Sequence, residues 1–399
     1  HKTILVDGTE NKIVSFFGWE VINTALVSIV TSGYFLLLCF VLPLLSGIAD
    51  YAGKKKTFLR SFCYLGSLAC VGLYFFDVNH LELSMLVFAI AGIGFWSSLV
   101  FYNAYLPEIA PLDEHDSLSA KGFSLGYIGS VILLVICLIL VMSQEGDARA
   151  EATRWCFVFT GIWWFGFSHV TYYWLPKSNV NNKVDRSVIW NGFKELKLVY
   201  GKIKKTVRLK RYLASFFVYS MAVQTIMIMA IYFGTKEINW SSDEEKSTGL
   251  IIAIIMIQLL AILGSLLLSK LSFKIGNLNA LKIVLILWIA LCLYAYFVVS
   301  PFDFYIISAI VGLVMGGVQS LSRSTYSKFI PQETVDTSSF FSFFDVAEKL
   351  GIVIGMASYG FIEQLTGNMR NSIVALVLFF IIGLLLMFFV PKEEKINIA

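Results

Sequence analysis

Eleven apolar segments follow one another along this chain, and their length limits the fold more than any other feature. A run of about 18 or more apolar residues can cross the hydrocarbon layer as an α-helix, whereas an outer-membrane strand needs only about ten residues of alternating polarity. The segments are too long for such strands, so the sequence predicts an all-α membrane protein. The expected spans are residues 22–46, 57–76, 83–106, 121–143, 154–175, 212–234, 247–269, 281–300, 303–322, 339–362 and 371–391.

The composition agrees with this class. Hydrophobic residues make up 57% of the chain and charged residues only 15%, whereas soluble domains contain about 25% charged residues. The mean hydropathy is +0.76. The net charge of +4 predicts no nucleic-acid partner, because its placement follows the topology. The six cysteines lie inside apolar runs without a C-x-x-C spacing, so we expect packing roles, no metal site and no other cofactor.

The polar segment Ser46 to Lys56 reads S-G-I-A-D-Y-A-G-K-K-K and joins the first two spans. Gly47 and Gly53 allow a close backbone approach or a positive φ, as a tight turn requires. The consecutive lysines Lys54 to Lys56 indicate the cytoplasmic side, because basic residues concentrate there. We expect Asp50 to pair with a cation or with the N-terminus of a neighbouring helix. The segment is therefore predicted to be a hairpin at the cytoplasmic surface.

Placing this hairpin in the cytoplasm puts 22 of the 31 lysines and arginines on the cytoplasmic side and 7 on the opposite side. This threefold bias supports the orientation. Eleven spans with a cytoplasmic C-terminus leave His1 outside, yet nothing before Ala25 would carry residues 1–20 across the membrane. We therefore expect a protein of twelve spans whose first helix precedes His1.

A basic connection at residues 177–211 divides the chain, since it holds 11 of the 31 basic residues and only two acids. We expect an N-terminal helical bundle at 1–176 that lacks its first helix, and a C-terminal six-helix bundle at 212–399. The connection between them is then a cytoplasmic linker. Within it, Ile189 to Tyr200 either forms an amphipathic helix on the anionic leaflet or is part of a solvated connection.

A weak internal repeat supports the division into two bundles. Ser269 to Gly276 superposes on Ser46 to Gly53 with both ends in register, although Phe273 takes the place of Asp50. The repeat therefore preserves the turn but not the acid.

The hairpin carries a loop pattern of the general form G-x-L-A-D-R-x-G-R-K, with Ser46 in place of the first glycine and Tyr51 in place of the arginine. It resembles in this respect the cytoplasmic signature of the major facilitator superfamily. The resemblance implies two six-helix bundles that rock around a midplane site, which is alternating access. The pattern is matched at Ile48, Ala49, Asp50, Gly53, Lys54 and Lys55.

Four further stretches are F-Y-N-A-Y-L-P-E-I-A at Phe101–Ala110, K-G-F-S-L-G-Y-I-G at Lys121–Gly129, G-G-V-Q-S-L-S-R-S at Gly316–Ser324 and F-F-S-F-F-D-V-A-E-K at Phe340–Lys349. With them the chain resembles the autophagy-related vacuolar effluxer family and its bacterial relatives from about Leu45 onward. The resemblance implies a small polar solute such as an amino acid. One departure is Ser220 to Gln224, where the family often has Asn-Asp-Gly-Val-Gln and this chain has no acid.

The strongest polar cluster inside an expected span is Asp345, Glu348 and Lys349. At a rise of about 1.5 Å per residue, the two acids lie roughly 9 Å and 14 Å into a hydrocarbon core about 30 Å thick. The spacing lets Asp345 pair with Lys349 on one helix face and leaves Glu348 as an unpaired third charge. The cluster is either a cation or proton site on the transport path or a structural ion pair between helices.

Five other polar side chains are candidates for the substrate or ion path. Arg323 either binds a carboxylate or phosphate or anchors its helix at the cytoplasmic interface. Gln224 and Gln258 are mid-span amides that either line the path or hydrogen-bond neighbouring helices. Gln319 lies in the same polar helix end as Arg323, and Asn103 lies near the cytoplasmic end of the third visible span.

A cytoplasmic gate is expected at the hairpin and at the end of the third visible span. The aromatic residues there are alternatively an interfacial belt. We favour a gate over a substrate site for the hairpin, because the second copy of the repeat lacks its acid. The gate candidates are Asp50, Gly53, Lys54, Lys55, Tyr102 and Glu108.

These features favour a secondary transporter over an enzyme, because no Cys/His cluster or nucleophile–base pair stands out. No G-x-x-x-x-G-K-[ST] loop occurs, which argues against ATP drive. The alternative is a non-transporting membrane sensor or docking protein of the same fold that acts through the basic linker. We expect a small-molecule solute, the lipid bilayer and protons or another coupling ion as partners, a monomer, and a bacterial cytoplasmic membrane rather than a eukaryotic vacuole.

Overall fold

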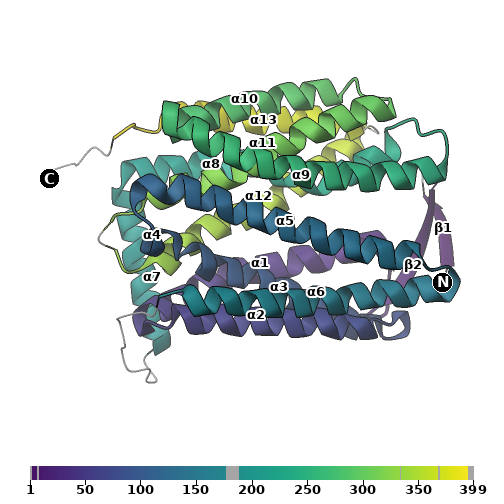
Figure 1. Cartoon of the computed structure of the whole chain (residues 1–399), viewed down its shortest axis with the longest axis horizontal. Coiled ribbons are helices and arrows are strands. Elements are labelled where there is room, and N and C mark those ends of the chain that lie inside the picture. The colour runs from purple at the N-terminus through teal and green to yellow at the C-terminus, as the bar shows by residue number, and fades with distance from the viewer. Residues whose placement is uncertain (1, 7–8, 177–187, 333, 367–368, 394–399) are drawn as a thin grey trace. The chain divides into compact units, whose positions relative to one another are not determined.

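The chain folds into two compact units, shown in the computed structural model of Figure 1. Unit 1 consists of residues 1–102 and 133–193, and unit 2 consists of residues 103–132 and 194–399. Helices α5 and α7 supply residues to both units, and the last residue of α3, Asn103, belongs to unit 2. The structure describes residues 2–6, 9–176, 188–332, 334–366 and 369–393.

Unit 1 begins with a small antiparallel sheet of three strands in the order β1-β2-β3, an element that the hydropathy pattern did not predict. Lys2 pairs with Ile13, and Phe16 pairs with Trp19 across the turn to the last strand. After the sheet, α2 packs along α6. The strands are β1 (Lys2–Val6), β2 (Thr9–Phe16) and β3 (Trp19–Ile22), and the helices are α1 (Asn23–Ala52), α2 (Lys55–Gly72), α3 (Leu81–Asn103) and α6 (Gly146–Trp174), with short 3-10 turns at Leu73–Phe75 and Val78–His80.

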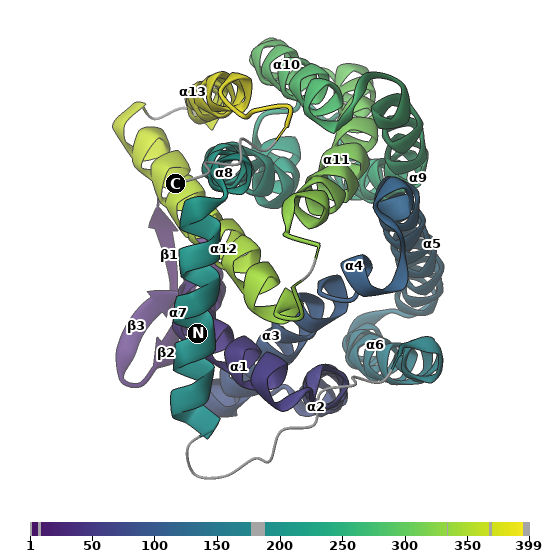
Figure 2. The ribbon, with the colours of Figure 1, turned by 90° about the vertical axis from the view of Figure 1, so that its left-hand side faces the viewer.

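Unit 2 is a helical bundle, and Figure 2 shows it along the helix axes. In this unit α9 packs on α11, α8 packs on both α12 and α13, and α10 packs on α13. Its elements are α4 (Leu106–Ile109), a 3-10 turn (Leu112–Glu114), α8 (Val207–Lys236), α9 (Asp243–Ile275), α10 (Asn277–Ala295), α11 (Pro301–Phe329), α12 (Thr337–Thr366) and α13 (Met369–Phe388), together with parts of α5 (His115–Met142) and α7 (Val188–Lys205).

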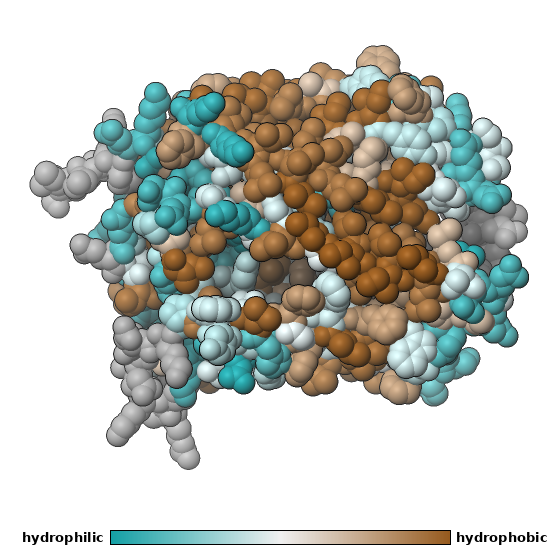
Figure 3. All heavy atoms as spheres, viewed as in Figure 1, coloured by the Kyte–Doolittle hydropathy of each residue, from teal (hydrophilic) through white to brown (hydrophobic). Residues whose placement is uncertain are grey.

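Each expected span corresponds to one long helix, namely α1, α2, α3, α5, α6 and α8 to α13. Nine helices in the described part of the chain are long and apolar enough to cross a membrane. The other two, α6 and α12, contain 29 and 30 residues. Tryptophan and tyrosine lower the hydropathy of α6, and buried charges lower that of α12. Over α9, α10 and α11, Figure 3 shows hydrophobic residues along the middle of the helices and hydrophilic residues at their ends.

The expected hairpin after the first span is tighter than the sequence indicated. Helix α1 continues to Ala52 and α2 begins at Lys55, so only two residues form the turn. Gly53 has a φ of 64°, as its role in a tight turn requires. The repeat shares this geometry, because Gly276 has a φ of 84° between α9 and α10. In both copies the apolar pattern ends before the helix does, since polar residues outside the membrane still continue the helical hydrogen bonds.

Polar residues begin two helices of unit 2 by satisfying free backbone N–H groups. Ser242 accepts a hydrogen bond from the Glu245 backbone N–H at 3.1 Å, and acidic residues follow in the first turn of α9. Ser300 accepts from the Asp303 N–H at 3.1 Å before α11, whose first residue is Pro301. These caps fix where two neighbouring helices start.

Glycines bring α9 and α11 into close contact. A Cβ at Gly312 would lie 2.5 Å from the carbonyl oxygen of Ile257. A Cβ at Gly316 would lie 2.7 Å from the carbonyl carbon of Ala261. Only residues without a side chain allow two helix backbones to approach this closely. This seam holds the polar end of α11 against its neighbours.

Of the two alternatives for Ile189 to Tyr200 in the basic linker, a helix or part of a solvated connection, the structure has the helix, α7. Its residues Val199 and Ile203 are buried, and Lys202 Nζ lies 2.6 Å from Asp336 Oδ2 just before α12. The second half of α7 is therefore tied to unit 2 by both apolar contacts and an ion pair. The first part of the linker, residues 177–187, lies outside the described residues. The division of the chain at this linker and the position of α7 on a leaflet stay predictions.

Candidate functional site

The charged residues of α12 form one connected cluster with α8. Lys349 has no exposed surface, and its Nζ lies 2.7 Å from Asp345 Oδ1 and 3.0 Å from Glu348 Oε2. Gln224 on α8 donates a hydrogen bond from Nε2 to Glu348 Oε1 at 2.7 Å. The pairing of Asp345 with Lys349 across one helical turn is the one that their spacing predicts. The cluster joins two packed helices near their middle.

Glu348 is not the unpaired third charge that the sequence predicts. Its carboxylate accepts one hydrogen bond from the neighbouring Lys349 and another from Gln224. Spacing along one helix could not reveal this second partner, which lies 124 residues away in the sequence. Two carboxylates therefore share one ammonium group.

The cluster retains binding capacity for a positive charge. Asp345 Oδ2 is buried and accepts no hydrogen bond from the described residues. The Glu348 side chain is 20% exposed, so part of the cluster is not enclosed by the protein. Two carboxylates and one ammonium leave a net negative charge, which is costly in a low-dielectric interior unless a proton or cation compensates it. The arrangement is therefore suited to taking up a proton or a small cation.

A second polar group lies at the end of α11. Arg323 is 7% exposed and donates through Nη1 to Asn103 Oδ1 and through Nε to Ser119 Oγ, both at 3.0 Å. Its guanidinium also lies 4.5 Å from the ring centre of Phe123. The side chain thus points into unit 2 rather than out to the interface, and it brings together two of the predicted path residues.

The remaining path candidates, Gln319 and Gln258, have different contacts. Gln319 Oε1 accepts a hydrogen bond from Tyr127 Oη at 2.6 Å, and Gln319 Nε2 lies 3.3 Å from Met227 Sδ. Gln258 Oε1 is buried and has no donor among the described residues. Two amides of unit 2 therefore lie inside an apolar bundle, and neither has a charged partner among the described residues.

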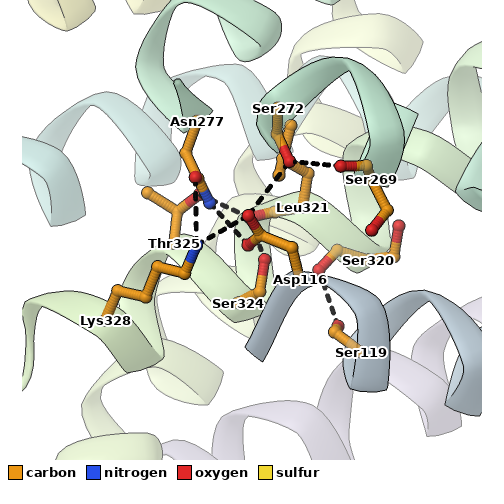
Figure 4. Close-up of polar contacts among 10 residues, drawn as sticks. All are labelled: Asp116, Ser119, Ser269, Ser272, Asn277, Ser320, Leu321, Ser324, Thr325 and Lys328. Atoms are coloured by element: carbon orange, nitrogen blue, oxygen red, sulfur yellow. Dashed lines mark hydrogen bonds and ion pairs between the residues drawn. The ribbon is translucent and has the colours of Figure 1, made fainter. Parts of the chain in front are cut away.

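Sequence reasoning missed a third group, centred on Asp116 in the first turn of α5 (Figure 4). Lys328 Nζ lies 2.6 Å from Asp116 Oδ2, and Ser272 Oγ donates to the same oxygen at 3.0 Å. Asn277 Nδ2 donates to Asp116 Oδ1 at 2.7 Å. One carboxylate thus connects α5 with α9, α10 and α11. The signal in the sequence was weak, because Asp116 lies among other polar residues that look like an ordinary interfacial turn.

The expected gate residues of unit 1 lie around the turn between α1 and α2. Asp50 and Lys55 are buried, with 8% and 6% of their surface exposed, whereas Lys54 is exposed. The Gly53 N–H donates to the Asp50 carbonyl oxygen at 3.2 Å and closes the turn. Tyr102 at the end of α3 is 37% exposed. Burial of an acid and a base beside a tight turn shows that this segment is packed rather than freely solvated.

One gate candidate belongs to unit 2. Glu108 on the short helix α4 accepts a hydrogen bond from Thr337 Oγ1 at 2.9 Å, and Thr337 is the first residue of α12. The same helix α12 carries the buried charge cluster further along. Glu108 is therefore linked to the helix that carries the charged site.

Solved membrane transporters share the fold of this chain. The chain superposes on the E. coli fucose:proton symporter FucP with a TM-score of 0.69 at 15% identity, covering 92% of both chains. A bacterial homologue of the iron transporter ferroportin matches with a TM-score of 0.62 at 10% identity, covering 91% of this chain and 89% of that one. The fold is that of the major facilitator superfamily.

Within this class, the chain belongs to the family described as "Vacuole effluxer Atg22 like", whose pattern matches residues 5–399. It is 29% identical to the uncharacterized MFS-type transporter YxiO of Bacillus subtilis over 368 residues, which is 90% of this chain and 82% of YxiO. It is 24% identical to autophagy-related protein 22 of Coccidioides immitis over 465 residues, covering 97% of this chain and 76% of that protein. The resemblance found in the sequence is confirmed, and the chain is a multi-pass membrane transporter.

Proposed function

We propose that this protein moves a small polar organic solute, such as an amino acid, across the membrane by alternating access. The buried cluster of Asp345, Glu348, Lys349 and Gln224 carries the proposal, because an apolar transport fold would not retain such charges without a use for them. Arg323, Asn103, Gln319 and Gln258 supply further polar atoms for the path of a solute. The description of the family as effluxers supports export.

Proton or cation coupling is assigned to Glu348 and Asp345. A carboxylate that loses its charge on protonation no longer competes for Lys349, so the hydrogen bonds around it rearrange. Such a change alters the relative stability of two conformations, and this is how an ion gradient can bias alternating access. The structurally similar FucP is described as a proton symporter, which supports this type of coupling here.

The turn at Asp50, Gly53, Lys54 and Lys55 acts in this proposal as a cytoplasmic gate element, with Tyr102 and Glu108 as further members. The two bundles at 1–176 and 212–399 would move about the linker at 177–211. We place the protein as a monomer in a bacterial cytoplasmic membrane, in line with its similarity to a Bacillus subtilis protein.

Uptake into proteoliposomes tests the proposal. Purified protein is reconstituted with a panel of amino acids and other small polar solutes, and each solute is also tested for its effect on thermal stability. We expect at least one solute both to move across the membrane and to raise the melting temperature. If a solute raises the melting temperature but none moves, the protein is a sensor of the same fold. If neither effect occurs with any solute, the transporter proposal loses its support.

A further inference from the structure

His115 is a buried titratable side chain that the proposed transport path does not use. It is the first residue of α5, and only 1% of its surface is exposed. Of the other histidines, the structure describes His80 and His169, and both are exposed. His115 precedes the expected span at 121–143, on the side that the charge bias predicts to be cytoplasmic. A group whose charge changes near neutral pH is thus enclosed at this helix end.

The hydrogen bonds of the ring define its neutral form. Nε2 lies 3.1 Å from the carbonyl oxygen of Ala110, and because a carbonyl oxygen only accepts, Nε2 carries the hydrogen. Nδ1 is buried and has no hydrogen-bond partner among the described residues. In the neutral ring Nδ1 carries no hydrogen, whereas in the imidazolium it carries one that needs an acceptor. The enclosed position therefore accommodates the imidazole and not the imidazolium.

The surroundings of the ring also disfavour a positive charge. Lys328 on α11 repels an imidazolium at this position, and the first turn of α5 carries the partial positive charge of a helix N-terminus. Asp116 and Asp113 are the described residues that attract it. However, Asp116 Oδ2 already lies 2.6 Å from Lys328 Nζ, and Asp113 is exposed, so that water screens its charge. Together with burial, these charges keep the ring neutral in this conformation.

The contact of His115 fixes the start of α5. Its hydrogen bond to Ala110 closes the connection between α4 and α5, which includes the 3-10 turn at Leu112–Glu114. The next residue, Asp116, bonds to Ser272 on α9, Asn277 on α10 and Lys328 on α11 (Figure 4). If the first turn of α5 leaves its place, Asp116 is therefore withdrawn from three helices of the same unit.

We propose that His115 is a pH sensor, which keeps the start of α5 packed in unit 2 when it is neutral and releases it when it is protonated. A proton from the cytoplasm binds at Nδ1, the imidazolium turns to water, and the hydrogen bond from Nε2 to Ala110 breaks. Deprotonation reverses the change. An exposed imidazole has a pKa of about 6.5, so the released form takes up a proton as pH falls through this value, whereas the packed form does not. The contact is therefore stable above this pH and is lost progressively below it.

Amide hydrogen exchange tests the proposal on the purified protein in neutral detergent, and it needs no transport. Exchange over residues 110–120 is compared between the wild type and His115→Gln, once at about pH 8 and once at about pH 5.5, which lie on either side of the pKa of a free imidazole. The intrinsic exchange rates of the two proteins nearly match at any one pH. Glutamine keeps an N–H group for Ala110 but is not protonated. The control is His169→Gln, which removes an exposed histidine of unit 1.

A second measurement uses the wild type alone and covers the case that His115→Gln folds poorly. The hydrogen on ring carbon Cε1 of a histidine exchanges with solvent at a rate that depends on the access of water to the ring. The ring of His115 should exchange more slowly than that of His169 at about pH 8, because its packed form must open first.

At about pH 8 the amides of the wild type and of His115→Gln should exchange at equal rates. At about pH 5.5 the wild type should exchange up to about tenfold faster, which is the ratio of protonated to neutral imidazole one unit below its ordinary pKa. His169→Gln should follow the wild type at both pH values. Equal rates of the wild type and His115→Gln at the lower pH overturn the proposal, as does loss of the effect in His169→Gln. A ring hydrogen of His115 that exchanges as fast as that of His169 overturns it as well.

Discussion

Lys349 and Asp345 form a buried ion pair within one turn of α12, with Nζ and Oδ1 2.7 Å apart and no exposed surface on the lysine. A buried lysine is stable in its charged form only beside compensating carboxylates. Since Glu348 lies 3.0 Å from the same ammonium, Lys349 holds two acids together. The lysine is thus the structural centre of the cluster, whereas the two acids are the groups to which we assign the coupling proton in the proposed function.

Replacement of this lysine tests its structural role. Lys349→Met keeps most of the side-chain volume but leaves two buried carboxylates without their cation. We expect a loss of about 3–5 kcal/mol in stability, visible as a lower melting temperature in detergent. Adding Asp345→Asn and Glu348→Gln to the same variant should recover most of the loss. A single variant as stable as the wild type would show that solvent or another group already neutralises the acids.

Glu348 is the group through which pH should act. In the wild type, Gln224 Nε2 donates a hydrogen bond to Glu348 Oε1 at 2.7 Å. Glu348→Gln keeps an oxygen that can accept this hydrogen bond but removes the titratable group. Transport should then become independent of pH while expression and melting temperature stay near those of the wild type. The measurement is the initial rate of uptake into proteoliposomes across a series of pH values.

Glu363→Gln is the control for this experiment. Glu363 lies on the same helix and pairs with Lys236 at 3.4 Å, but its side chain is 30% exposed and far along the helix from the cluster. Removing its charge should leave the pH profile unchanged. Unchanged pH dependence in Glu348→Gln would remove Glu348 from the coupling mechanism.

The sequence could predict the helices because a membrane-spanning helix needs a long run of apolar residues, and the hydropathy of the sequence shows such runs. It could not predict their ends, since a helix continues wherever backbone hydrogen bonds can form. Helix α9, for example, extends to Ile275 through polar residues beyond the apolar run. The small sheet before α1 was missed for a related reason, because short paired strands depend on register rather than on hydropathy.

In the candidate site, too, some contacts could be predicted from the sequence and others could not. Asp345 and Lys349 could be paired from their spacing, because both lie on one helix. The contact of Gln224 with Glu348 depends on how α8 packs on α12, which no local pattern contains. Asp116 was missed altogether, since its partners come from three other helices. Within a helix, spacing determines contacts, whereas between helices packing does.

Asp50→Asn tests the proposed gate. An acid in the last turn of a helix is opposed by the helix dipole, so a buried Asp50 at the end of α1 is retained against a cost. We expect the variant to shift the balance between inward- and outward-facing states without changing which solute binds. The readout is thiol labelling from each side of a single cysteine introduced in place of Gln319 in the proposed path, on a background in which the six native cysteines are replaced by serine. A change in solute selectivity would instead place Asp50 in the substrate site.

Gly316→Ala tests the seam between α9 and α11. The new Cβ would lie 2.7 Å from the carbonyl carbon of Ala261, so the two helix backbones must separate. We expect a loss of about 1–3 kcal/mol, measured by thermal unfolding. Gly360→Ala on α12 is the control, because its Cβ meets nothing within 4 Å and alanine favours a helix. Equal melting temperatures for both variants would mean that the seam adjusts freely.

Asp116→Ala tests the group that connects α5 with the ends of three other helices. The change removes the acceptor of Lys328, Ser272 and Asn277 at once. We expect a loss of about 1.5–3 kcal/mol, as for hydrogen bonds to a charged group, and not more, because the Lys328 side chain is 21% exposed and can turn to water. Thermal unfolding in detergent measures the effect.

Asp116→Asn separates the ion pair from the hydrogen bonds. The amide can still accept from Asn277 or Ser272 but no longer attracts Lys328, so its melting temperature should lie between those of the wild type and Asp116→Ala. Because the pair is partly exposed, its contribution is screened by salt, and the difference between wild type and Asp116→Asn should shrink as ionic strength rises. Asp113→Ala, three residues earlier and exposed, should behave like the wild type at every salt concentration. A salt-independent difference would show that the carboxylate acts only as a hydrogen-bond acceptor.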